Sequence, residues 1–129
     1  MSELLKTYLI LLGLLFVFDF IWLATTNKRF YQKELKGLML EKIKYLPAII
    51  FYLIYPLGIA LFVVSPNTTE HNLFNVGIMG AIFGFICYGT YDLTNLATIK
   101  NWSLKVTIVD LIWGSLLTAI TSVLCLSMI

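Results

Sequence analysis

Four long apolar stretches constrain the fold of this chain more than any other feature of its sequence. They cover residues 7–26, 45–64, 74–98 and 104–128. Each is about as long as the run of roughly 20 mostly apolar residues that an α-helix needs to cross a bilayer. Since together they occupy most of the 129 residues, little chain is left for a soluble domain. We therefore predict an all-α fold, a single membrane domain over residues 1–129 built as a bundle of four transmembrane helices.

Composition excludes several other classes of protein. The chain is 60% hydrophobic and 12% charged, whereas a soluble domain has about 45–50% apolar and about 25% charged residues. A net charge of +2 offers no broad basic surface, so no nucleic acid is expected as a partner. Two cysteines are too few for a disulfide scaffold. The predicted depths of Cys87 and Cys125 differ by about 10–15 Å, which is too much for a bridge between them.

Basic residues are distributed very unequally between the segments that connect these stretches. Lys6 lies on one side of the predicted bundle, and the other eight lie on the opposite side: Lys28, Arg29, Lys33, Lys36, Lys42, Lys44, Lys100 and Lys105. Loops rich in Lys and Arg remain in the cytoplasm. We therefore expect a multi-pass membrane protein with both termini on the outer side, which in a bacterial cell means the inner membrane with both termini in the periplasm. The first stretch should be retained as a span, because it is too long for a signal peptide and no cleavage site follows it.

The basic segment between the first two stretches has two interpretations. Its apolar residues would share one face of a helix, which could lie in the membrane interface with its lysines near anionic headgroups. Alternatively, the segment is a charged connector that only sets the topology, and Gly37 weakens a helix there. The sequence leaves both open. The apolar residues concerned are Tyr31, Leu35, Leu38, Met39 and Ile43.

Three aspartates, Asp19, Asp92 and Asp110, lie inside the apolar stretches. A charge at the bilayer centre costs about 2.5–3.5 kcal/mol on insertion scales, so such residues usually face the interior of a bundle. Each aspartate is only five to nine residues from a basic residue of the cytoplasmic side. All three therefore lie roughly 7–14 Å from those charges, at a depth that Tyr52 and Tyr55 share. We expect four helices to bring polar groups to one level in the inner half of the membrane.

Helical-wheel positions agree with this expectation. On the third stretch, Tyr91, Asp92 and Asn95 share one face, and small residues lie on the same face nearer the other end of the helix. Small residues let neighbouring helix backbones approach closely. The glycines predicted to pack in this way, including one on the fourth stretch, are Gly77, Gly80, Gly84 and Gly114.

A short sequence repeat links the first and fourth stretches. Asp19-Phe20-Ile21-Trp22 matches Asp110-Leu111-Ile112-Trp113 at three of four positions. The two helices are predicted to run in opposite directions, as the halves of an inverted repeat do in transporters. In so apolar a sequence, chance is the better explanation of a match of this length.

Our first hypothesis for function is the binding or transport of a small cation, proton or amphipathic substrate. The ligand would occupy a cavity that opens to the cytoplasmic side, and its candidate binding residues are Asp19, Asp92, Asn95, Asp110, Tyr91, Tyr55, Trp22 and Trp113. The second hypothesis is a lipid-modifying membrane enzyme or its accessory subunit. The third is a structural or assembly protein in which the aspartates only hydrogen-bond helices together.

The sequence assigns no catalytic residue, and an enzyme therefore ranks below a binding protein. It contains neither a Gly-x-Ser-x-Gly elbow nor a His-Glu-x-x-His zinc pair. No cofactor and no metal are predicted; if a hard cation were bound, Asp19, Asp92 and Asp110 would be its oxygen ligands. The expected partners are membrane lipid and a small-molecule or ion ligand, and the oligomeric state is left open.

One segment carries a resemblance to a known family. The segment Tyr88-Gly89-Thr90-Tyr91-Asp92-Leu93-Thr94-Asn95, together with the two Asp-x-x-Trp motifs, resembles small bacterial predicted membrane proteins that are grouped as a domain of unknown function. The resemblance extends over nearly the whole chain. It implies a four-helix membrane fold and assigns no activity, substrate or cofactor.

Overall fold

The computed structural model describes residues 2–129, and these residues form four helical rods that confirm the predicted all-α membrane fold. The first rod is α1 (Glu3–Thr26), which continues through the π-helical turn η1 (Asn27–Tyr31) into α2 (Gln32–Glu34). The second is α3 (Tyr45–Ile59), which continues through the π-helical turn η2 (Ala60–Val64) and the 3-10 turn η3 (Ser65–Asn67). The third and fourth are α4 (Leu73–Thr98) and α5 (Leu104–Met128). The rods have 32, 23, 26 and 25 residues, and each is long and apolar enough to cross a membrane.

Three of the rods begin at a polar side chain that caps the helix. The side-chain oxygens of Ser2, Asn72 and Ser103 accept hydrogen bonds from backbone N–H groups three residues further along, at 3.0–3.1 Å. Such caps satisfy amide groups that would otherwise have no partner in the first turn. The helix starts are therefore encoded locally in the sequence.

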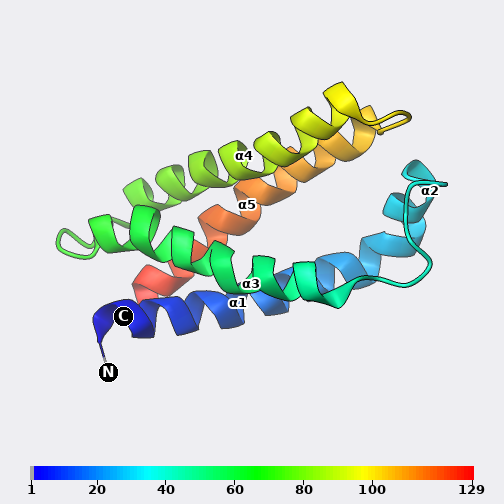
Figure 1. Ribbon diagram of the computed structural model, residues 1–129. Helices are drawn as coiled ribbons and strands as arrows, with labels where there is room; N and C mark the ends of the chain where they lie inside the picture. The colour runs from blue at the N-terminus through cyan, green and yellow to red at the C-terminus, as the bar shows by residue number, and fades with distance from the viewer. Residues whose placement is uncertain (1) are drawn as a thin grey trace.

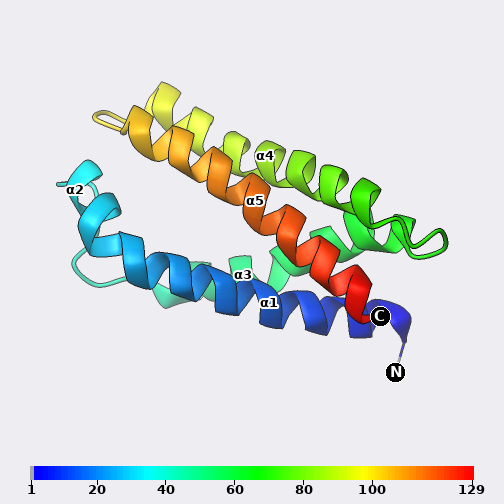
Figure 2. The same cartoon turned by 180° about the vertical axis from the view of Figure 1, so that it is seen from behind.

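The rods are arranged as two pairs that meet at one end of the molecule and separate towards the other (Figure 1 and Figure 2). The α4 and α5 helices form the most extensive contact, and α3 packs mainly on α1. The chain termini and the turn before α4 lie where the pairs meet, which we call the narrow end. The connector after α2 and the turn between α4 and α5 lie where the pairs separate, which we call the wide end.

The hydrophobic core lies towards the narrow end, where side chains from all four rods are packed together. Thr7, from the first turns of α1, is also buried there, and its carbonyl oxygen accepts a contact from the Cys125 thiol at 3.7 Å. His71 joins the turn before α4 to the end of α5 through a hydrogen bond between its Nε2 and the Leu126 carbonyl, at 2.9 Å. This core closes the narrow end. Its buried members are Leu11, Leu15, Tyr55, Ile59, Ala60, Val63, Val64, Val76, Leu117, Cys125 and Leu126.

Glycines allow α4 and α5 to approach closely. A Cβ atom added at Gly84 would overlap the Gly114 carbonyl, and one added at Gly80 would lie 2.9 Å from the Thr118 carbonyl oxygen. A Cβ at Gly114 would overlap the ring of Tyr88. Gly77 also lies at this contact, 3.2 Å from Val123 by the same measure. The structure thus places all four predicted packing glycines in the α4–α5 contact.

The basic segment after the first stretch does not form the amphipathic helix over 31–43 that one interpretation required. The helix ends at Glu34, and Gly37 has a φ of +85°, a conformation that glycine adopts without strain. Tyr31 and Leu35 turn towards the protein, whereas Met39 and Ile43 remain exposed. The apolar residues are therefore divided between two environments, and residues 35–44 are an irregular connector.

Candidate binding site between the helix pairs

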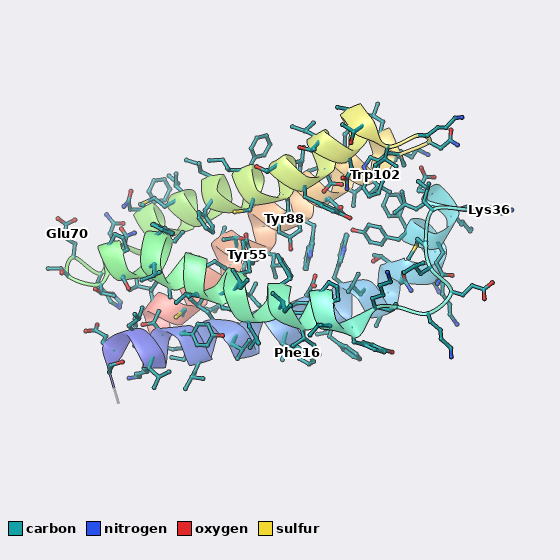
Figure 3. All side chains as sticks on the ribbon, viewed as in Figure 1. Phe16, Lys36, Tyr55, Glu70, Tyr88 and Trp102 are labelled. Carbon is teal, nitrogen blue, oxygen red and sulfur yellow. The ribbon has the colours of Figure 1, made fainter. Side chains whose placement is uncertain are left out.

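A cavity of about 540 Å³ lies between the two helix pairs on the wide-end side of the hydrophobic core. Figure 3 shows Tyr88 projecting from α4 into the space between the pairs, with Tyr55 nearer the narrow end. Most of the lining side chains are aromatic or apolar, and two are acidic. They come from all four rods: Asp19, Trp22, Leu23, Tyr31, Pro47, Ala48, Phe51, Tyr52, Cys87, Tyr88, Tyr91, Asp110 and Trp113.

Asp19 of α1 is held by one residue from each of two other helices. Tyr52 of α3 donates a hydrogen bond to its Oδ2, and the indole N–H of Trp113 of α5 donates to its Oδ1 at 3.1 Å. Only 8% of the residue is exposed. Such donors offset the cost of burying a carboxyl group in an apolar environment. Asp19 therefore joins α1 both to α3 and to the opposite helix pair.

Asp110 of α5 is held by a chain of donors from the first rod. The Tyr31 hydroxyl donates to Asp110 Oδ1 at 2.5 Å, and the Trp22 indole N–H donates to the Tyr31 hydroxyl at 3.0 Å. Tyr31 can reach α5 because the first rod bends after Thr26 and carries α2 towards the α4–α5 pair (Figure 1). Ser103 supports the same bend by donating to Glu34 Oε1 at 2.8 Å.

The two copies of the Asp-x-x-Trp repeat meet in this cavity. Residues three apart on a helix lie on the same face, so each motif presents its aspartate and its tryptophan together. The rings of Trp22 and Trp113 stack with centroids 4.4 Å apart and planes 8° apart. Trp113 binds Asp19 directly, and Trp22 binds Asp110 through Tyr31. Whatever the origin of the repeat, its two copies make reciprocal contacts across the gap between the helix pairs.

Asp92 lies beside this network but does not line the cavity. It is fully buried, and neither of its carboxyl oxygens has a hydrogen-bond partner among the described residues. Asp110 and the Trp102 indole are its polar neighbours. A polar group buried without a partner costs about 1–3 kcal/mol in protein mutational data. Asp92 is thus a polar side chain buried between α4 and the neighbouring part of α5.

The other predicted site residues lie at different distances from the cavity. Tyr91 lines its rim, is 56% exposed, and contacts the Trp102 ring edge to face at 5.8 Å. Tyr55 lies on the narrow-end side, where its hydroxyl shares a 2.6 Å hydrogen bond with Thr118 Oγ1. Asn95, which is partly buried, is one helical turn beyond Tyr91 and is not among the lining residues. The cavity therefore brings together Asp19, Asp110, Tyr91, Trp22 and Trp113 of the predicted set, and not Asp92, Asn95 or Tyr55.

Three tyrosines line the cavity although they were not among the predicted binding residues. Tyr52 was expected near the level of the aspartates, and it contacts Asp19; Tyr88 belongs to the segment that carries the family resemblance. For Tyr31, nothing in the sequence indicated a position at this site. In a regular α-helix it would lie about 180° from Trp22, at about 100° per residue. The π-helical turn η1 and the bend after Thr26 bring it to the side of Trp22.

The carboxyl groups do not form a metal-binding cluster. In residues 2–129, no group of three or more His, Cys, Asp and Glu side chains is placed to hold a metal ion together. The donors to Asp19 and Asp110 are neutral hydroxyl and indole groups, which hold a carboxyl oxygen without removing its capacity to bind a cation. The arrangement is suited to binding a small molecule between aromatic walls.

Comparisons with known proteins agree with the membrane fold. A family model described as a predicted membrane protein (DUF2177) matches residues 4–127. No curated protein and no solved structure matches the chain.

Proposed function

The chain belongs to the DUF2177 family of predicted membrane proteins, and we propose that this membrane protein binds and transports a small cationic or amphipathic ligand. The observation that carries this proposal is the cavity. It contains two acidic side chains that are contributed by opposite helix pairs, Asp19 and Asp110. At about 540 Å³ it has the volume of a small-molecule site, which ranges from about 300 to 1,000 Å³.

The hydrophobic core separates the cavity from the narrow end, which is the arrangement that a carrier loading from the cytoplasmic half of the membrane requires. The hydrophobic core fills the narrow end, and the space lies towards the wide end. At the wide end, the helix pairs are joined by the Asp19–Trp113 and Asp110–Tyr31 hydrogen bonds. A ligand that replaced either of these hydrogen bonds with a bond of its own would change the contact between the helix pairs. Such differential contact is the physical requirement for coupling binding to movement.

We further propose that the protein lies in the bacterial inner membrane with the wide end in the cytoplasm and both termini in the periplasm. Both connectors that carry most of the basic residues lie at the wide end, where Figure 3 labels Lys36, while Glu70 marks the narrow end. Loops rich in Lys and Arg remain cytoplasmic. An impermeant thiol reagent should label a Lys36→Cys variant only from the cytoplasm and a Glu70→Cys variant only from the periplasm. The reverse pattern would contradict this orientation.

Ligand binding can be tested through Cys87, which lines the cavity and is partly exposed, whereas Cys125 is fully buried. In nanodiscs, the rate at which a permeant maleimide labels Cys87 should fall when the cavity is occupied. Tetraphenylphosphonium, dodecylamine, dodecanol and dodecanoate would be titrated in turn, with a Cys87→Ser variant as the background control. If none of these compounds slows labelling, the binding proposal is wrong.

Transport is tested separately with the compound that protects Cys87. Uptake into proteoliposomes should exceed that of protein-free vesicles and should fall at least tenfold in the Asp19→Asn and Asp110→Asn variants. A Glu70→Gln variant removes a carboxylate from the distant turn before α4 and should transport normally. If the aspartate variants lower thermal stability but leave uptake unchanged, the carboxyl groups only hold the helices together.

A further inference from the structure

We infer that the ligand is an amphipathic ammonium compound, whose charged head lies between Asp19 and Asp110 and whose hydrocarbon part leaves sideways between α3 and α4. This inference rests on the proposed function and specifies its substrate class. It draws on the charge of the cavity, its aromatic walls and the position of its opening.

The charge of the cavity favours a cation. Two of its lining side chains are acidic, and none of the described residues that line it is Lys, Arg or His. The groups already bonded to Asp19 and Asp110 are neutral indole and hydroxyl donors, so no positive charge balances the two side chains from inside the cavity. An ammonium group has both the charge and the N–H donors that these carboxyl oxygens can bind.

The walls around the acidic groups are also suited to a cation. The stacked pair Trp22 and Trp113 lies between Asp19 and Asp110, and Tyr52 and Tyr88 line the same space. The faces of aromatic rings attract ammonium groups, and indole does so most strongly. The inner faces of the two indoles cover each other, so the ligand head would meet an outer indole face or the rings of Tyr52 and Tyr88 beside a carboxyl group.

The cavity opens among side chains of the candidate spans α3 and α4, which favours a ligand with a hydrocarbon part. Its rim includes Pro47 and Phe51 of α3 and Tyr91 of α4; Phe51 is 42% exposed and Tyr91 is 56% exposed. Side chains of α3 and α4 meet nearer the narrow end, where the Tyr55 and Phe83 rings stack at 5.9 Å. Beyond this contact α3 packs mainly on α1, which leaves a slot between α3 and α4.

The basic connectors make the slot a better entrance than the gap between the helix pairs at the wide end. Eight of the nine Lys and Arg residues lie in or beside the connectors at the wide end. Like charges would repel a soluble ammonium compound that approached from the water. A molecule that is already dissolved in the bilayer would reach the acidic groups through the slot without passing these charges.

The head-group part of the inference is tested on the wild-type protein, so that it does not depend on any variant that fails to fold. In nanodiscs of phosphatidylglycerol, dodecylamine should slow the labelling of Cys87 at least tenfold more than dodecanol or dodecanoate at equal concentration. Equal protection by dodecanol or dodecanoate would overturn the inference while leaving the binding proposal intact. Protection by tetraphenylphosphonium alone would also overturn the inference and leave the binding proposal intact, because this cation has no hydrocarbon tail and no N–H group.

The source of the ammonium group is resolved by changing the lipid. If it is a lipid headgroup, nanodiscs that contain phosphatidylethanolamine should protect Cys87 without added amine. If it is a free amphipathic amine, protection should require dodecylamine in both lipid mixtures. Either result supports the inferred chemistry.

Sideways entry is tested with a matched pair of variants on α3. Ala48 lines the cavity, and its neighbour Ile49 is 54% exposed and is not among the lining residues. Ala48→Trp should obstruct the slot and reduce protection by dodecylamine at least fivefold, whereas Ile49→Trp should leave it unchanged. Equal behaviour of the two variants, with both retaining the wild-type thermal transition, would show that the tail does not pass between α3 and α4.

Discussion

Substitution of Gly84 by alanine provides the most direct test of the α4–α5 contact that supports the cavity. A Cβ atom at this position would overlap the Gly114 carbonyl and lie 2.6 Å from Thr118 Oγ1, whereas ordinary van der Waals contact begins at 3.4 Å. Even the more adaptable threonine side chain would have to move by about 0.8 Å. Because the Gly114 carbonyl is backbone, the two helices themselves must separate.

The expected cost follows from two opposing effects. Overpacking of a tight contact destabilises the protein by about 1–3 kcal/mol. Replacing glycine by alanine within a helix stabilises it by up to about 1 kcal/mol. Because the overlapped atom belongs to the backbone, we expect an overpacking cost in the upper part of this range, about 2–3 kcal/mol. The Gly84→Ala variant should therefore be destabilised by about 1–2 kcal/mol. For a chain of this length that corresponds to a fall in Tm of roughly 3–10 °C.

Gly13 provides a matched control, since it lies within α1 and a Cβ added there meets no atom within 4 Å. Gly13→Ala should leave the Tm unchanged or raise it slightly. Unfolding in detergent can be followed with a thiol-reactive dye that reports exposure of the fully buried Cys125, in a Cys87→Ala background. If Gly84→Ala and Gly13→Ala have the same Tm, the close approach of α4 and α5 is not what the structure indicates.

Three further substitutions test the hydrogen bonds around the cavity, each by thermal unfolding. Trp113→Phe keeps an aromatic ring but removes the N–H donor to Asp19, and should cost about 1–3 kcal/mol; an unchanged Tm would show that this donor contributes nothing. Tyr31→Phe removes the donor to Asp110 and should cost a similar amount, and a full loss of folding would exceed what one hydrogen bond explains. Asp92→Asn adds an amide donor beside Asp110 where no bond exists now, so the Tm should be equal or higher; a marked fall would contradict the unpartnered state of Asp92.

Much of the fold could be predicted because the bilayer imposes simple requirements on sequence. A span must be about 20 mostly apolar residues long and must satisfy its backbone groups internally, so four such stretches indicate four helices. The predicted limits of the last two stretches, 74–98 and 104–128, differ by at most one residue from those of α4 and α5. Caps at Asn72 and Ser103 make these starts a local property of the sequence.

The candidate site could be predicted only in part. The depth of a residue and its face on the helix do not determine how far its side chain lies from side chains of other helices. Asp19 and Asp110 were predicted to share a cavity with Trp22 and Trp113, and the structure places all four around it. Asp92 was predicted from the same arguments, yet it points into the α4–α5 contact. The wheel position of a residue cannot distinguish the face that meets the nearest helix from the face that meets a cavity.

The sequence alone determined that this protein has four helices long and apolar enough to span a membrane, because hydropathy and helical rise are properties of each helix separately. The tertiary structure decided which helices pair, that the pairs diverge at the basic end, and that the two Asp-x-x-Trp motifs contact each other there. It also decided that Tyr31 reaches Asp110, through a π-helical turn and a bend. These features depend on the crossing of helices that are distant in sequence, and no periodicity within a single helix specifies that crossing.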